Sequence, residues 1–206
     1  MDVSRNIKSL KISSPPTVSN QRFIKRSEEE VWQDFINGSE SALVYIYREY
    51  SNKLFNYGMH FVKDREFVLD VMQDLFYYLI KTHERLGKTT SIKFYLFSSM
   101  RRMVIRRLKD ERRLNTESLG QKSFDVAFQG VDPGSLEEYE VKLLKNACDS
   151  LPPRQKEAIL LLFYEELSYS EIAEVMCIKK IKYARTLIYR SIETLRSIIT
   201  RSKSSR

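Results

Sequence analysis

The sequence predicts an all-α fold: two small helical domains joined by a flexible linker, with a helix-turn-helix in the C-terminal domain. Only 6 glycines and 5 prolines occur in 206 residues, too few for the many tight turns of a β-sandwich or barrel. Apolar residues recur at intervals of three and four, which is the period of an amphipathic helix. This pattern is lost over residues 113–134, where asparagine, glycine and proline occur, so we expect the linker there.

The first domain is predicted over residues 27–112 as four helices. Residues 1–26 precede it and carry five serines and two adjacent prolines with little apolar periodicity, which is typical of a disordered arm. Ser27 and Glu30 match a capping box, in which each side chain bonds the other residue's backbone amide. We therefore expect a short first helix that begins after Ser27 and ends at Asn37-Gly38.

The other three helices of this domain follow from the same kind of pattern. Ser39 precedes a helix of five or six turns, and Asp64 precedes the next. We expect Gly87 to end that third helix in a left-handed conformation, and Ser91 to cap the fourth. The fourth helix carries aromatic residues beside cations, and we expect at least two of these rings in the core: Phe94, Tyr95 and Phe97.

The second domain is predicted over residues 135–206. Two capping boxes and a proline pair mark its helix boundaries: Ser135/Glu138, Ser168/Glu171 and Pro152-Pro153. A short turn at Cys177-Ile178-Lys179 leads into a last helix from about Lys180 to Thr200. A short helix, a tight turn and a cation-rich helix indicate a helix-turn-helix, whose second helix enters the DNA major groove. We expect Ile178, Ile181, Ala184, Leu187 and Ile188 to pack inward, and Lys180, Lys182, Tyr183, Arg185 and Thr186 to face outward.

Charge is concentrated in two short segments. The chain carries +8 overall, but residues 92–113 carry +6 and residues 179–206 carry +8, whereas residues 114–178 carry −7. Clustered positive charge indicates an anionic partner, and nucleic acid is the commonest one. The first basic segment also contains aromatic residues, a combination that suits single-stranded or melted DNA.

Several classes of protein are excluded by what the sequence lacks. It contains no run of 18 apolar residues and no apolar leader, so we expect a cytoplasmic protein without membrane insertion. Two cysteines and two histidines stand in no metal-ligand spacing, and no nucleophile–base pair or glycine-rich phosphate loop occurs. We therefore expect neither an enzyme nor a bound metal, cofactor or small-molecule substrate.

Five short motifs in this order resemble a known family. They are Ala42-Leu43 with Tyr47, Tyr50 and Leu54-Phe55; residues 70–76; Tyr95-Leu96-Phe97; residues 151–155; and residues 167–173. The set resembles the extracytoplasmic-function (ECF) subfamily of bacterial RNA polymerase sigma factors, over about residues 28–197. The resemblance implies an initiation factor that binds core RNA polymerase and promoter DNA. It also implies an anti-sigma partner, a domain two that melts the −10 element and a domain four that reads the −35 element.

The resemblance also implies roles for particular residues. The exposed polar positions of the third helix would bind the polymerase: Asp70, Gln73 and Asp74. The loop before the fourth helix and the basic segment after it would bind the −10 element: Gly87, Lys88, Thr89, Thr90, Ser91, Lys93, Arg101, Arg102 and Arg106. The last helix would enter the −35 groove: Lys180, Lys182, Tyr183, Arg185, Thr186 and Arg190. Acidic linker residues would thread toward the polymerase active-site path: Asp125, Asp132, Glu137 and Glu138.

Two positions depart from the family pattern. Cys177 stands where the turn of the helix-turn-helix usually has glycine, and this turn is one residue longer than the common pattern. We therefore expect the last helix to begin within one residue of Lys180. Arg102 stands where members commonly carry asparagine. The alternative function is a helix-turn-helix regulator that binds its operator as a dimer without polymerase. A third is an adaptor that captures a partner helix and binds no DNA.

Overall fold

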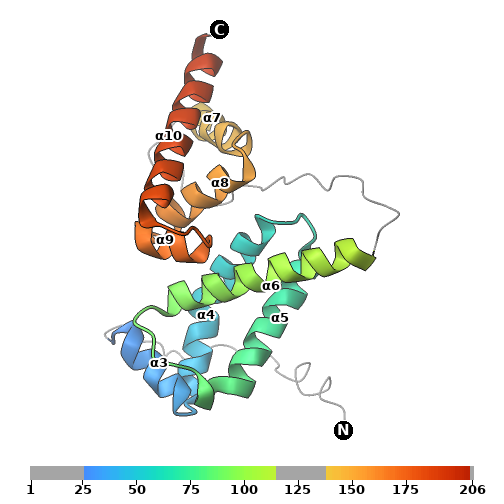
Figure 1. Ribbon diagram of the computed structural model, residues 1–206, viewed down its shortest axis with the longest axis vertical. Helices are drawn as coiled ribbons and strands as arrows, with labels where there is room; N and C mark the ends of the chain where they lie inside the picture. The colour runs from blue at the N-terminus through green and yellow to red at the C-terminus, as the bar shows by residue number, and fades with distance from the viewer. Residues whose placement is uncertain (1–25, 115–137, 205–206) are drawn as a thin grey trace.

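The computed structural model describes residues 26–114 and 138–204, and every regular element in those ranges is helical (Figure 1). The all-α prediction is therefore confirmed. The predicted arm and linker lie almost entirely outside the described residues, as do Asp125, Asp132 and Glu137. No helix in the described ranges is long and apolar enough to span a lipid bilayer.

Four helices and one 3₁₀ turn form an N-terminal bundle. They are α3 (Glu28–Ile36), α4 (Glu40–Met59), α5 (Arg65–Thr82), η1 (His83–Arg85) and α6 (Ile92–Leu114). The predicted caps Ser27 and Ser91 each accept a backbone hydrogen bond at the start of their helix. Ser39 and Asp64, predicted to precede the other two helices, do the same. In Figure 1, α6 crosses α4 and α5 and packs against both helices.

The core of this bundle lies where α4, α5 and α6 meet. Gly58 allows the closest approach, because a Cβ atom there would lie 2.6 Å from Val68 Cγ1 and 2.7 Å from Met100 Cε. Phe97 is fully buried, and Phe94 and Tyr95 are partly buried and pack against the core, as the sequence predicted. The rings of this segment therefore stabilise the fold, which leaves its cations as candidates for contacts with DNA.

The prediction for Gly87 is wrong. Gly87 does not adopt a positive φ, and α5 ends at Thr82, followed by the 3₁₀ turn η1. The amide of Leu86 donates to the carbonyl of His83 and closes that turn. Because the chain leaves the helix through this turn, no left-handed residue is required there.

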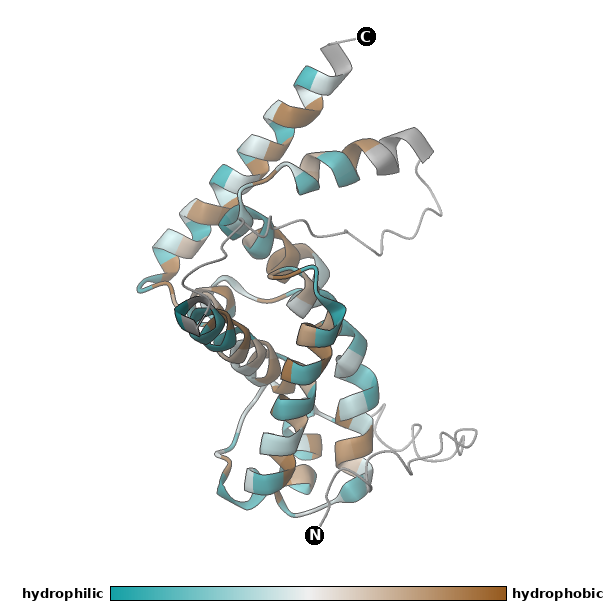
Figure 2. Ribbon diagram, turned by 90° about the vertical axis from the view of Figure 1, so that its right-hand side faces the viewer, coloured by the Kyte–Doolittle hydropathy of each residue, from teal (hydrophilic) through white to brown (hydrophobic). Residues whose placement is uncertain are grey.

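The second group of helices forms a C-terminal bundle. It contains α7 (Glu138–Asp149), α8 (Pro153–Ile159), the π-helical turn η2 (Leu160–Tyr164), α9 (Tyr169–Val175) and α10 (Ile181–Ser204). Pro153 lies in the first turn of α8, as predicted, and Ser168 and Glu171 form the capping box of α9. The π turn was not predicted. Figure 2 shows apolar and polar residues alternating along α10, whose apolar side faces α8 and α9.

The turn between α9 and α10 is a Schellman motif centred on Cys177. Its φ is +53°, the amide of Ile178 donates to Ala173 O and the amide of Cys177 donates to Glu174 O. Cys177 thus takes the left-handed position that glycine usually occupies. α10 begins at Ile181, and Ile181 is 46% exposed, so its predicted inward packing is wrong. Ala184 and Ile188 are buried, and Ile178 and Leu187 are partly buried, as predicted.

Candidate nucleic-acid interface

The first half of α10 exposes one polar, basic face. All of the residues predicted to read the −35 element are exposed: Lys180, Lys182, Tyr183, Arg185, Thr186 and Arg190. Ala184 and Ile188 anchor the opposite face in the core. The Arg185 guanidinium lies 5.4 Å from the centre of the Tyr169 ring, in a cation–π contact with the first residue of α9. The geometry therefore presents cations on the surface that a helix-turn-helix inserts into a groove.

The residues predicted to bind the −10 element divide into two groups. Gly87, Lys88, Thr90, Arg102 and Arg106 are exposed, and Thr89 and Ser91 are partly exposed. Lys93 and Arg101 instead point to the C-terminal bundle. Lys93 Nζ donates to the carbonyl of Glu165 at 2.9 Å, and Arg101 Nε donates to Glu157 Oε1 at 2.7 Å.

Glu157 joins the two bundles through a buried network. Its side chain is 4% exposed, that of Arg101 is 13% exposed, and the Tyr57 hydroxyl donates to the same Oε1 at 2.9 Å. Burial and the Glu157 carboxylate raise the pKa of Tyr57 well above its usual value, so the phenol keeps its proton. Burial favours a lower pKa for Arg101, but Glu157 more than offsets this and raises it. This carboxylate thus holds α4 and α6 against α8.

A buried histidine lies beside that network. His60 is 2% exposed and follows α4, where it faces the Pro153–Lys156 turn of α8. Burial, and then the charge of Lys156, lowers the pKa of His60 to about 4. Lys156 is itself bound to Asp149 at 2.6 Å. The imidazole is therefore neutral at pH 7 and its protonation opposes the contact between the bundles.

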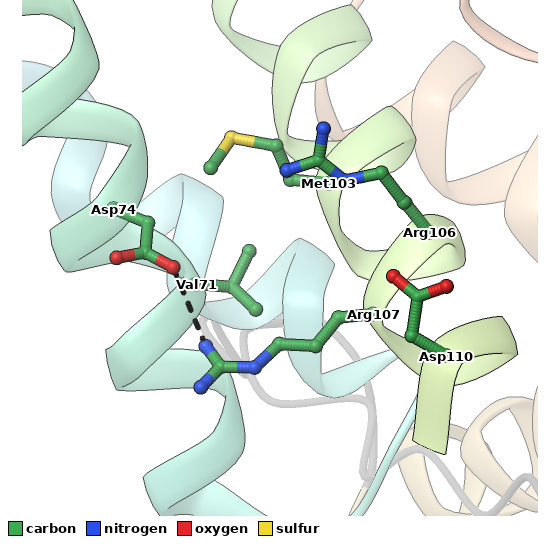
Figure 3. Close-up of a pocket in the computed structure, with 6 residues that line it drawn as sticks. All are labelled: Val71, Asp74, Met103, Arg106, Arg107 and Asp110. Carbon is green, nitrogen blue, oxygen red and sulfur yellow. Dashed lines mark ion pairs between the residues drawn. The ribbon is translucent and has the colours of Figure 1, made fainter. Parts of the chain in front are cut away.

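The residues predicted to bind polymerase lie on the exposed side of α5. Asp70, Gln73 and Asp74 are all exposed, and Arg107 of α6 lies 3.5 Å from a carboxylate oxygen of each aspartate. Figure 3 shows Arg107 reaching Asp74 across a pocket of about 270 Å³ between α5 and α6. Both aspartates are more than half exposed, so these pairs contribute little to stability.

Sequence reasoning missed several residues of this interface. Neither Glu157 nor Tyr57 belongs to a recognised motif. The one sign of the role of Glu157 in the sequence was its position directly before the buried run that begins at Ala158. Arg107 belonged to the predicted basic segment but had no assigned partner. Trp32 and Glu28 were placed in a short structural helix, although Trp32 contacts the segment before α6 and Glu28 contacts the first residue of α6.

Comparison with known protein families shows which family each bundle matches. The model "Sigma-70 region 2" matches residues 46–114, and the model "Sigma-70, region 4" matches residues 142–195. These segments cover the helices that carry the two basic surfaces. They define a sigma factor of the sigma-70 class, a non-catalytic initiation factor that directs RNA polymerase to promoters through regions 2 and 4.

Individual relatives narrow this class. SigV of Bacillus subtilis (strain 168) is 23% identical over 167 residues, covering 81% of this chain and 96% of that protein. The ECF sigma factor SigM of the same organism is 24% identical over 163 residues, covering 76% and 94%. The chain belongs to the extracytoplasmic-function sigma factors, as the sequence motifs predicted.

Two solved structures share the fold. One is the sigma factor RpoE from Bartonella quintana in complex with the anti-sigma factor NepR, with TM-score 0.56 and 18% identity over 77% of this chain and 94% of that one. The other is CnrH in complex with the cytosolic domain of CnrY, with TM-score 0.58 and 16% identity over 85% and 98%.

We predict that Glu157→Ala separates the two bundles. The change leaves the Arg101 guanidinium and the Tyr57 hydroxyl buried without their acceptor, at a cost of about 3 kcal/mol, which separation relieves by letting water in. Small-angle scattering should show a larger radius of gyration, and urea unfolding a lower stability. Glu174→Ala, at an exposed glutamate of α9, is the matched control and should resemble wild type. Unchanged size and stability in Glu157→Ala would contradict the role of the network.

We predict that His60 makes stability fall in mild acid. Its folded pKa of about 4 lies below the ordinary 6.5, so between these values the unfolded chain binds more protons. Stability is complete above about pH 6.5 and is lost as pH falls toward 4. The free energy of unfolding should drop by about 2 kcal/mol more between pH 7 and 5 in wild type than in His60→Leu. Urea titrations at both pH values measure this, and equal drops in the two proteins would refute it.

Proposed function

We propose that residues 27–112 act as sigma domain two, which melts the −10 element, and residues 135–206 as sigma domain four, which reads the −35 element. The observation that carries this proposal is the one-sided first half of α10, with cations outward and Ala184 and Ile188 buried beneath. The exposed loop residues before α6, together with Arg102 and Arg106, supply a second basic surface on a separate matched segment. Two DNA-binding surfaces in one chain suit a two-element promoter.

We also propose that the exposed side of α5 binds the core polymerase. Asp70, Gln73 and Asp74 project from consecutive turns of one rigid helix, and the carboxylates give this side a negative charge. Arg107 orients both aspartates from α6. The same helix pair thereby connects polymerase binding to the basic segment of α6.

The remaining partners follow from the relatives. RpoE was solved in complex with the anti-sigma factor NepR, and CnrH in complex with the cytosolic domain of CnrY. An anti-sigma factor is accordingly the partner proposed for this chain. Its place of action is the cytoplasm, where chromosomal promoters and polymerase are found. The acidic residues around 125–138 are proposed to follow a basic path in the polymerase.

Run-off transcription from a promoter library tests the proposal as a whole. Core polymerase should select specific promoters only when this protein is added. A helix-turn-helix regulator would instead bind its operator without polymerase and confer no promoter selection on the core enzyme. An adaptor would do neither.

Asp74→Arg should abolish binding to core polymerase while the fold is kept. It reverses the charge on the proposed contact surface, and the pair it breaks with Arg107 is too exposed to affect stability by more than about 1 kcal/mol. Pull-down of core enzyme measures binding, and circular dichroism checks folding. Arg107→Ala removes the same ion pair but keeps the acidic surface, so it should still bind. Normal recovery of folded Asp74→Arg would rule out α5 as the contact.

Arg185→Ala should relax base selection at one or two −35 positions. A guanidinium one turn into a recognition helix can donate two hydrogen bonds to guanine, worth roughly 1–3 kcal/mol of discrimination. Lys182→Ala and Arg190→Ala should weaken binding evenly across sequences and each lower the salt dependence by about one unit, because they hold phosphates. A series of −35 mutants, bound by each variant with core polymerase, separates the two behaviours. Uniform loss in all three variants would show that α10 only grips the backbone.

A further inference from the structure

Helix α3 lies outside both matched family segments, which cover residues 46–114 and 142–195, yet it contacts the connection between α5 and α6 at three points. Glu28, Trp32 and Ile36 are spaced four residues apart and therefore share one face of this helix. Their partners are Ile92, Gly87 and His83, in the reverse order along the chain. The connection thus runs antiparallel along α3, as Figure 1 also shows.

The first contact fixes the start of the loop. Trp32 Nε1 donates to the carbonyl of Gly87 at 2.9 Å, and the indole is 1% exposed. Its ring packs against Tyr95 of α6, with 4.9 Å between ring centres. The donor is therefore held rigidly from two sides. On the preceding turn, the His83 ring lies 3.0 Å from the carbonyl of Ile36 through Nδ1.

The second contact fixes the end of the loop. Glu28 Oε2 accepts a hydrogen bond from the amide of Ile92 at 2.8 Å, where α6 begins. Its other oxygen accepts from the Tyr50 hydroxyl of α4. A carboxylate at a helix N-terminus is also favoured by the helix dipole. Both oxygens are used, so the carboxylate has little freedom to move.

The residues between these two contacts form the outer part of the loop. Lys88 and Thr90 are exposed, and the Thr89 hydroxyl bonds both the carbonyl and the amide of Ser91. Ser91 in turn caps α6 through the amide of Phe94. The loop is therefore a short arch with two fixed ends and local bonds within it.

We propose that α3 positions this arch for promoter recognition: Trp32 and Glu28 fix its two ends and thereby determine which −10 base the arch accepts. The inference rests on the −10 role proposed above for residues 87–91. Trp32 and Glu28 are positioning residues, since they contact the loop and not the DNA. Loss of either contact leaves the arch able to sample several geometries, so discrimination between bases falls.

Selection from a promoter library randomised at the −10 element, with core polymerase and a constant −35 element, tests this. Trp32→Phe keeps an aromatic ring but removes the donor to Gly87, and Glu28→Gln leaves one acceptor oxygen where two are needed. Each should reduce the ratio of preferred to next-best base roughly fivefold, the effect of one lost hydrogen bond. Preference at the −35 element and affinity for core enzyme should stay unchanged.

Three controls make the result decisive. Glu29→Gln changes the neighbouring exposed glutamate, and Val31→Ala shortens a buried side chain of α3 that can form no hydrogen bond with the loop; neither should alter base preference. Replacement of Lys88, Thr89 and Thr90 by alanine should alter it.

The outcomes separate the two proposals. If the alanine replacement of residues 88–90 alters base preference but Trp32→Phe and Glu28→Gln do not, the inference fails and the loop's role stands. If Val31→Ala matches Trp32→Phe, general loosening explains the result and the inference also fails. If the replacement itself has no effect, the −10 role is wrong.

Discussion

The arrangement of the two bundles depends on one buried carboxylate. Burying Glu157 costs several kcal/mol unless partners replace its hydration, and Arg101 and Tyr57 do so from two helices of the other bundle. The three groups therefore stay buried together or gain water together. Because Arg101 is held by Glu157, a contact between Arg101 and a DNA phosphate requires that ion pair to break. One interaction thus links the relative placement of the bundles to the availability of a basic residue for DNA.

Helix α6 contacts each of the candidate surfaces of the N-terminal bundle. Its first residue is held by Glu28 of α3, Arg101 in its middle by Glu157 of α8, and Arg107 further along lies beside Asp70 and Asp74 of α5. Its buried side, including Phe97, packs in the core of the N-terminal bundle. The position of this one helix is therefore set jointly by α3, α5 and α8, since close-packed interiors deform little.

Much of the fold was predictable because the interactions that define helices are local. Capping joins residues three apart, so Ser27 with Glu30 and Ser168 with Glu171 could be recognised directly from spacing. Apolar periodicity identified the buried side of α10 at Ala184 and Ile188. It was wrong at Ile181, the first residue of α10, which is 46% exposed. The prediction that Gly87 ends the third helix was wrong because α5 ends at Thr82 and a 3₁₀ turn follows it.

The sequence by itself determined the helices, their caps, the two basic segments and, through five spaced motifs, the family. Only the tertiary structure decided which charged residues remain free to bind a partner molecule, because a charged residue can be paired with a residue far away in the chain. Glu157 lies 100 residues from Tyr57, and Trp32 lies 55 residues from Gly87. No local pattern encodes such pairs. Whether a glutamate is solvated or buried, and whether a tryptophan only fills the core or also holds a loop, is set by which helices pack together.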